Sequence, residues 1–273
     1  MSTPLVTKDA DIETAAHAAQ CVVETHHRLA GWLKSGVTLA QIDTYVAQQL
    51  ADLKCKSCFL GYKAGGSPAF PSHACLSPNT CIVHGTAGFY TEPMKPGDIL
   101  SIDLGVTYHG WIGDAAWTYA FEHASDEALR LMKCGRESIA LGVAELRPEN
   151  TYIEFARAVQ ECVEGDYGYH CVRGLGGHGI GRKLHQPPFV ANNVPTHPGE
   201  WPDAYTKCKP GTLVAVEPMI AVGSAQIAQN GKEWPIFTAD DSLSVHYEHD
   251  VLITDGDPRV LTAGLEELPD IVG

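Results

Sequence analysis

The sequence carries four acidic residues in apolar surroundings, where a negative charge is hard to keep. Asp103 lies within the run ILSIDLG, and Asp114 follows in WIGDAAW. Glu217 and Glu248 lie in similar settings, LVAVEP and VHYEHDVLI. A lone ionised carboxylate in a protein core is costly unless it is paired or binds a metal, and like charges placed close together need a cation between them. We therefore expect these acids to surround divalent metal, and to hold two ions.

The expected ligands narrow the choice of metal and of reaction. Carboxylate oxygens with an imidazole suit Mn, Fe(II), Co or Zn better than an ion that selects thiolates. Two ions about 3.5–4 Å apart can share a hydroxide and stabilise the transition state of a hydrolysis. For each acid alone, a carboxylate that faces water from an edge strand is the simpler alternative. Four acids in matching settings disfavour that alternative.

Three histidines lie in settings that favour chemistry over packing. His178 and His185 are seven residues apart in GGHGIGRKLHQPP, with glycines before and between them, and His84 follows the apolar run TCIV. His178 is the candidate nitrogen ligand of the metal. His185 would then be free to hydrogen-bond a substrate carbonyl or a developing oxyanion, and His84 is the third candidate.

Two stretches of the chain repeat the same pattern. KPGDILSID and KPGTLVAVE both have Lys-Pro-Gly, five further residues and an acid, and the two acids, Asp103 and Glu217, are 114 positions apart. Each copy follows two helical patterns. We interpret this as an internal duplication, within a single catalytic domain 1–273 whose halves span roughly 9–121 and 125–255.

The elements that must position these residues follow from hydrophobic periodicity and turn signals. Helices are expected at 9–34, at 38–53 with Thr38 as N-cap, at 126–143, and at 150–164 with Asn150 or Thr151 as cap. Strands are expected at 80–85, 97–105, 111–121, 209–223 and 242–255. The turn signal at 108–110 predicts a hairpin that brings Asp103 and Asp114 onto adjacent strands.

The composition excludes several classes of protein. The chain has 273 residues, is 44% hydrophobic and carries a formal net charge of −14, which argues against a nucleic-acid binder. Its start lacks a signal-peptide pattern, and no apolar run reaches about 20 residues, so we expect neither secretion nor a membrane span. Nine cysteines scattered through the chain indicate reduced thiols and a cytoplasmic protein.

Taken together, the motifs resemble those of a known enzyme family. The sequence resembles the type I methionine aminopeptidases of the pita-bread (M24) metallopeptidases from about residue 10 to 260. The resemblance rests on Asn79-x4-His84-Gly85, Asp103-x10-Asp114, His178-Gly-Ile-Gly-x3-His185, Glu217-Pro218-Met219 and Tyr247-Glu248-His249. It implies an α+β fold of two pseudo-symmetric halves, each with two helices and an antiparallel sheet, around a central dinuclear metal site.

The resemblance also implies a role for each site residue. The metal ligands would be Asp103, Asp114, His178, Glu217 and Glu248. The catalytic residues would be His84, His185 and Glu217, of which Glu217 takes the proton of the metal-bridging water. The substrate-binding pocket for the methionine side chain would draw on Tyr62, Phe70, Cys75, Leu184 and Trp234, with Phe59 as a weaker candidate.

The activity implied by the resemblance is the removal of N-terminal Met from proteins and peptides with a small second residue, through a metal-bridged hydroxide. Two divalent metal ions (Co, Mn, Fe(II) or Zn) would be the cofactors. The partners would be nascent polypeptide N-termini, with the ribosome as a further candidate. We expect a monomer that binds neither nucleic acid nor membranes.

Two other functions are compatible with the same scaffold. An Xaa-Pro aminopeptidase or prolidase usually carries a separate N-terminal domain, whereas only about 80 residues precede His84. A non-catalytic pita-bread binding protein would be expected to lose metal ligands, and all five are present. A type II methionine aminopeptidase would carry a long insertion after His185, for which the gap to Glu217 is too short.

The sequence departs from the family pattern without losing a ligand. Gln186 stands where Glu is usual, Ala115 and Ala116 stand where hydroxyl residues are common, His246 replaces a usual Gln and Asp250 a usual Thr. The stretches 62–70 and 190–210 are longer than is common. These departures bear on metal preference and on the shape of the pocket.

Overall fold

A tight turn at His109 and Gly110 joins the two longest strands, β4 (Ile99–Tyr108) and β5 (Trp111–Phe121). Both turn residues have positive φ, 48° and 76°, as a two-residue type I′ hairpin requires. The predicted hairpin is therefore confirmed. All of β5 and most of β4 are buried, because other elements cover the hairpin on both faces.

The computed structural model describes residues 4–64, 66–197 and 199–273. Residues 65 and 198, which fall in the two stretches expected to be long, lie outside the described residues. Within those ranges, the helices are all too short or too polar to cross a membrane.

The helices of the first half are α1 (Asp9–Ala30) and α2 (Leu39–Asp52). Thr38 caps α2 as predicted: its hydroxyl accepts the backbone N–H of Gln41, and the Gln41 side chain accepts the Thr38 N–H. This capping box satisfies two backbone donors that a helix start leaves free. The first helix was expected to reach residue 34 but ends at Ala30, because Gly31 weakens helix propagation.

The helices of the second half are α3 (Asp126–Ala144) and α4 (Tyr152–Gln160). Ser125 caps α3 through the backbone N–H of Ala128. The expected helix at 150–164 is α-helical only to Gln160 and continues as a π-helical segment, Glu161–Asp166.

Two larger sheets and two smaller ones lie between the helices. The first sheet has the order β1-β4-β5-β16, with β2 paired to β4; its remaining strands are β1 (Lys56–Ser57), β2 (Cys75–Pro78) and β16 (Ile271–Val272). The second has the order β15-β14-β9-β7-β8, with β15 (Arg259–Val260), β14 (His249–Leu252), β9 (Leu213–Val216), β7 (Gly176–Gly179) and β8 (Gln186–Ala191). All the pairings are antiparallel except that of β16 with β5.

Of the two smaller sheets, one lies within the second half of the chain and the other joins the two halves. One has the order β13-β10-β6, from β13 (Ser244–His246), β10 (Met219–Ala221) and β6 (His170–Cys171). The other has the order β11-β12-β3, from β11 (Ile227–Gln229), β12 (Ile236–Thr238) and β3 (Cys81–Val83). Because β3 comes from the first half and β12 from the second, this sheet ties the halves together.

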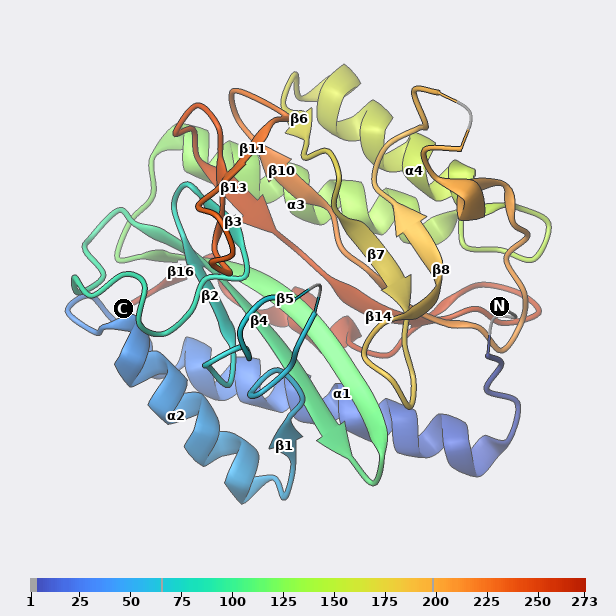
Figure 1. Cartoon of the computed structure of the whole chain (residues 1–273), viewed down its shortest axis with the longest axis horizontal. Helices are drawn as coiled ribbons and strands as arrows, with labels where there is room; N and C mark the ends of the chain where they lie inside the picture. The colour runs from blue at the N-terminus through green and yellow to red at the C-terminus, as the bar shows by residue number, and fades with distance from the viewer. Residues whose placement is uncertain (1–3, 65, 198) are drawn as a thin grey trace.

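The helices lie on the outside of the molecule. Figure 1 shows α1 and α2 along one side and α3 and α4 along the opposite side, with the strands between them. Helix α1 packs on β4 and β5, whereas α3 packs on β10 and β13. The strands thus meet at the centre, where their side chains can surround a common site.

The expected strands at 209–223 and 242–255 are each interrupted at an acid. Glu217 lies between β9 and β10, and Glu248 lies between β13 and β14. Pro218 has no backbone N–H for a strand ladder, which ends β9 at Val216. The backbone N–H of Glu248 instead donates to the carbonyl of Ala116 on β5, at 2.9 Å. Both acids are therefore at strand breaks, not within continuous strands.

Candidate metal centre

The hairpin presents its two acids on one face. Asp103 lies opposite Ala116, and Asp114 lies opposite Gly105. Residues directly opposite each other share a face of the sheet, as do residues two apart along a strand. Asp103 and Asp114 are therefore diagonal neighbours, and both are buried.

The second sheet brings His178 and the other two acids to the same place. His178 on β7 lies opposite Ala215 on β9, just before Glu217. Its Nε2 atom is 3.5 Å from Oε1 of Glu217 and 4.0 Å from Oδ2 of Asp114. Donor atoms of Asp114, His178 and Glu248 all lie within 4.8 Å of one another. The structure thus brings together the residues that the sequence predicted as ligands.

The charges of this cluster are unbalanced. Burial raises the pKa of Asp103, Asp114, Glu217 and Glu248, and neighbouring acids raise the pKa of Asp114 and Glu248 further. In the described part of the chain, Oδ1 of Asp103, Oδ1 of Asp114 and Oε1 of Glu248 are buried without a hydrogen-bond partner. Buried polar atoms are normally satisfied, so these oxygens fit the coordination of cations.

His178 is prepared to act as a nitrogen ligand. Burial lowers its pKa to about 3, with a further contribution from His185, so the imidazole is neutral at physiological pH. Its Nδ1 atom lies 3.1 Å from the carbonyl of Gly179. A proton on Nδ1 would donate to that carbonyl, which leaves Nε2 free for the metal.

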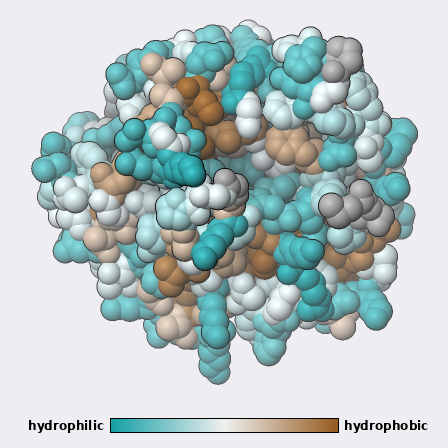
Figure 2. All heavy atoms as spheres, viewed as in Figure 1, coloured by the Kyte–Doolittle hydropathy of each residue, from teal (hydrophilic) through white to brown (hydrophobic). Residues whose placement is uncertain are grey.

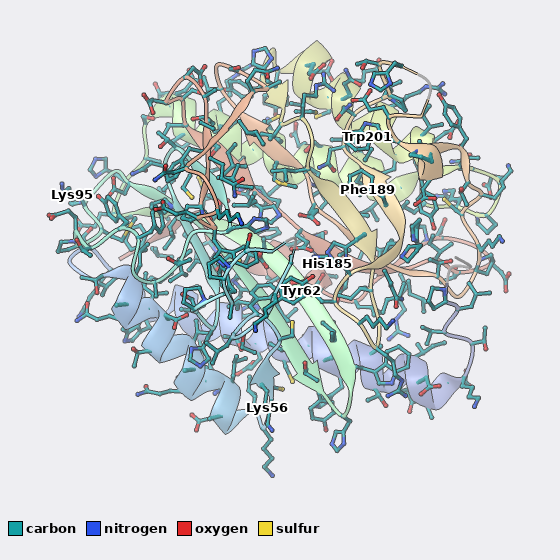
Figure 3. All side chains as sticks on the ribbon, in the orientation of Figure 1. Lys56, Tyr62, Lys95, His185, Phe189 and Trp201 are labelled. Atoms are coloured by element: carbon teal, nitrogen blue, oxygen red, sulfur yellow. The ribbon has the colours of Figure 1, made fainter. Side chains whose placement is uncertain are left out.

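The two other predicted histidines line the same cavity but belong to loops. His185 follows β7, and its Nδ1 lies 2.6 Å from the hydroxyl of Tyr62. Figure 3 shows these two side chains next to each other near the centre of the molecule. His84 directly follows β3 with a positive φ of 60°, and burial lowers its pKa to about 4, helped by His246.

An apolar pocket adjoins the acids. Phe70 contacts Phe59 and Trp234 edge to face, with ring centroids 6.3 and 5.3 Å apart. The Trp234 indole N–H donates to the carbonyl of Pro68 at 3.0 Å, and this bond ties together two loops far apart in sequence. Figure 2 shows that apolar side chains also reach the surface in patches on one face of the molecule.

All of the predicted site residues line one cavity of ≈ 540 Å³. Its lining includes Phe59, Tyr62, Phe70, Cys75, His84, Asp103, Asp114, His178, Leu184, His185, Glu217, Trp234 and Glu248. The cavity can therefore hold a polar reacting group at the acids and an apolar side chain at the aromatic rings.

Two buried residues near the acids were noted in the sequence only as departures from a family pattern. Oδ2 of Asp250 accepts the backbone N–H of Asp114 at 2.9 Å. The imidazole of His246 faces Glu217 and Glu248, with Nε2 3.5 and 4.0 Å from their nearest oxygens. Their place two residues from Glu248, on the same face of their strands, was the sequence signal that could have marked them.

Comparisons with known proteins find relatives over most of the chain. The model of metallopeptidase family M24 matches residues 13–255. A methionine aminopeptidase of Aquifex aeolicus is 34% identical over 92% of this chain and 96% of its own. A methionine aminopeptidase of Clostridium acetobutylicum is 35% identical over 94% of this chain and 98% of its own.

Solved structures give the same result. The crystal structure of methionine aminopeptidase from Rickettsia prowazekii has a TM-score of 0.86 and 26% identity, covering 96% of this chain and all (100%) of that one. Prolidase from Pyrococcus furiosus has a TM-score of 0.71 and 18% identity, and only 65% of its chain is covered, so that likeness shows the fold alone. The predicted α+β pita-bread fold is confirmed.

Proposed function

Because the chain belongs to metallopeptidase family M24, we propose that it is a methionine aminopeptidase that removes the N-terminal methionine of peptides and proteins with a small second residue. One observation carries the proposal: a cluster of buried acids with His178 and an apolar pocket line the same cavity. That arrangement fits a metallo-hydrolase that selects one apolar side chain beside the bond it cleaves.

The proposed metal ligands are Asp103, Asp114, His178, Glu217 and Glu248, which would hold two divalent ions. Metals bound there would supply a water acidified enough to attack a peptide carbonyl at neutral pH and would polarise that carbonyl. The unpartnered carboxylate oxygens and the neutral imidazole support this assignment. Mn, Fe(II), Co and Zn all suit such a set of ligands.

Glu217 is the proposed general base. Burial raises the pKa of its carboxyl group to about 8 in the absence of metal, and bound cations would lower that pKa again, which leaves an ionised carboxylate able to accept a proton at neutral pH. The side chain lines the cavity. We propose that Glu217 accepts the proton that the attacking water loses and then donates it to the departing amine.

The histidines are the proposed groups that orient the peptide and stabilise the charge that develops on its oxygen. Burial lowers the pKa of both His84 and His185, so each is a neutral hydrogen-bond donor at pH 7. A donor placed at a developing oxyanion in a water-poor site is worth about 3–4 kcal/mol in the transition state. The methionine side chain would enter the pocket formed by Phe70, Leu184 and Trp234, with Tyr62 and Cys75 beside it.

The organisation and setting of the protein are further proposals. We assign residues 1–273 to one catalytic domain, with related halves at about 9–121 and 125–255, because two helices precede the segments that carry the proposed ligands in each half. All nine cysteines are free thiols, which supports a reducing compartment such as the cytoplasm. We propose that the enzyme acts there as a monomer on new polypeptide N-termini, with the ribosome as its partner.

Peptide hydrolysis by chelated protein, resupplied separately with Mn, Fe(II), Co and Zn, tests the proposal. The substrates are Met-Gly-Ser, Met-Lys-Ser and Ala-Pro-Ser, and Asp103→Asn is the matched variant. We expect metal-dependent release of Met from Met-Gly-Ser alone, and its loss in the variant. Cleavage of Ala-Pro-Ser would instead identify an Xaa-Pro peptidase. No bound metal and no cleavage would identify a non-catalytic binding protein.

A further inference from the structure

A second buried imidazole faces the acids of the metal centre. Nε2 of His246 lies 3.5 Å from Oε2 of Glu217 and 4.0 Å from Oε2 of Glu248. Only 2% of the residue is exposed, and Nε2 has no hydrogen-bond partner within the described residues. An unpartnered nitrogen this deeply buried needs a ligand or a binding role to explain it.

The position of His246 mirrors that of His178 across Glu217. Nε2 of His178 is 3.5 Å from one carboxylate oxygen of Glu217, and Nε2 of His246 is 3.5 Å from the other. Donor atoms that bind one ion at about 2.0–2.2 Å stand roughly 3–3.5 Å apart. A direct N–H···O hydrogen bond would be shorter, about 2.7–3.2 Å. The spacing therefore fits two ligands of one ion better than a donor and its acceptor.

The backbone holds His246 in this position. Its N–H donates to the hydroxyl of Ser101 at 3.1 Å, and its carbonyl accepts the hydroxyl of Thr118 at 3.0 Å. Ser101 and Thr118 lie opposite each other on β4 and β5, the hairpin that carries Asp103 and Asp114. The strand of His246 is thus fixed to the strands of the proposed ligands, as a preorganised site requires.

We propose that His246 is an additional protein ligand of the metal centre, and that it gives a nitrogen donor to the ion on the Oε2 side of Glu217. The inference rests on the proposed function, since it assumes that the centre binds two ions. Each ion would then have one imidazole among its carboxylates. Such a set favours Zn, Co or Fe(II) over Mn more than a set with one imidazole does.

X-ray absorption of the zinc-loaded protein counts bound imidazoles directly and does not depend on activity. We expect two imidazoles per two zinc ions in the wild type, and one in His246→Gln and in His178→Gln. His249→Gln is the matched control, because His249 is a buried histidine on β14 whose Nδ1 is bound to Thr262 at 2.8 Å. It should leave the count at two.

Titration with Co²⁺, followed by its visible absorption and by elemental analysis, gives a second readout. Loss of an outer-shell partner alone costs about 10–100-fold in metal affinity. We therefore expect His246→Gln to weaken one of the two ions at least about tenfold and to leave the other within about threefold. His246→Leu should behave in the same way, since neither side chain replaces the imidazole.

The outcomes separate the inference from the proposed function. Two bound ions with an unchanged imidazole count in His246→Gln would overturn the inference, whether or not the metal affinity falls, while the peptidase assignment stands. A wild type that binds no ion and cleaves no peptide would overturn both. If neither His246 variant folds, the wild-type spectrum decides alone, because one imidazole per two ions excludes a second imidazole ligand beside His178 and overturns the inference.

Discussion

The hydroxyl of Tyr62 lies 2.6 Å from Nδ1 of His185, across the cavity that holds the acids. Burial raises the pKa of Tyr62, so the phenol stays protonated at neutral pH and can donate to Nδ1. His185 would then carry its own proton on Nε2. That tautomer is the one that can donate from Nε2 to a substrate oxygen.

Replacing Tyr62 by Phe should therefore weaken catalysis without emptying the metal centre. One hydrogen bond is worth about 0.5–1.5 kcal/mol, so we expect kcat for Met-Gly-Ser to fall about three- to tenfold, with KM and metal content unchanged. Tyr205→Phe is the control, because Tyr205 is 66% exposed and outside the cavity. Equal kcat values for Tyr62→Phe and wild type would show that the tautomer of His185 does not depend on Tyr62.

Replacing Asp103 by Asn should have opposite effects on stability with and without metal. In chelated protein at pH 8, the change removes a buried charge among other acids, one of whose oxygens, Oδ1, has no hydrogen-bond partner in the described chain, so the melting temperature should rise. With metal present, the variant should gain less from metal than wild type does, and its activity should fall. Asp255→Asn, at an exposed position, should leave the melting temperature unchanged both in chelator and with metal present. A fall in the chelated melting temperature of Asp103→Asn would mean that the carboxylate is stabilised without metal.

The stabilisation by metal should grow between pH 6 and pH 8. The folded-state pKa values of Asp103 and Glu217, about 7 and about 8, lie above their ordinary values of 3.8 and 4.5. Their contribution to stability is therefore complete below about pH 4 and is lost as the pH rises through the folded values. A bound metal ion would offset this loss of stability. Metal also binds more tightly once the carboxyl groups of Asp103 and Glu217 have lost their protons.

Thermal unfolding in chelator and in excess metal, at several pH values, measures this difference. His178 and His246, with pKa values lowered to about 3 and about 4, stay neutral over the whole interval and do not change the sign. Asp103→Asn should flatten the dependence. A gain that is constant from pH 6 to pH 8 would contradict the raised carboxyl pKa values.

The hairpin was predictable because its signals are local: an apolar run, a turn and a second run within one short stretch. The contact of Trp234 with Phe70 was not, since the two residues are 164 positions apart and only the family resemblance placed both in one pocket. The break at Glu217 follows from Pro218, yet the repeated pattern with Asp103 favoured a continuous strand. The place of His246 two residues before Glu248 was visible in the sequence, but its approach to Glu217 depends on how two sheets meet, which periodicity does not encode.

Leu184 should set how large a side chain the pocket accepts. It is 7% exposed and lies in the apolar cluster with Phe59 and Phe70. We expect Leu184→Ala to raise KM for Met-Gly-Ser. The ratio of kcat/KM for Phe-Gly-Ser to kcat/KM for Met-Gly-Ser should rise by about tenfold or more, since a change of one methylene is worth about 1–3 kcal/mol. Leu141→Ala, at a 51% exposed position, is the control. An unchanged ratio in Leu184→Ala would place the methionine side chain elsewhere.

Gly113 should be needed for the packing of α1 against the strand that carries Asp114. A Cβ atom at Gly113 would lie 2.5 Å from the carbonyl carbon of Ala18 and from the backbone nitrogen of Ala19. Backbone atoms inside a helix cannot turn away as a side chain can, so α1 would have to move off β5. Overpacking of this kind costs about 1–3 kcal/mol. Because Asp114 is the next residue, Gly113→Ala should also weaken metal binding.

Denaturant unfolding of Gly113→Ala in chelator, followed by Co²⁺ titration, measures both effects. Gly256→Ala is the matched control, because nothing lies within 4 Å of a Cβ built there, and its free energy of unfolding should stay within about 0.5 kcal/mol of wild type. A Gly113→Ala protein as stable as the control, with unchanged metal affinity, would show that α1 can shift freely on β5. Lost stability with unchanged affinity would show that the metal centre does not depend on this contact.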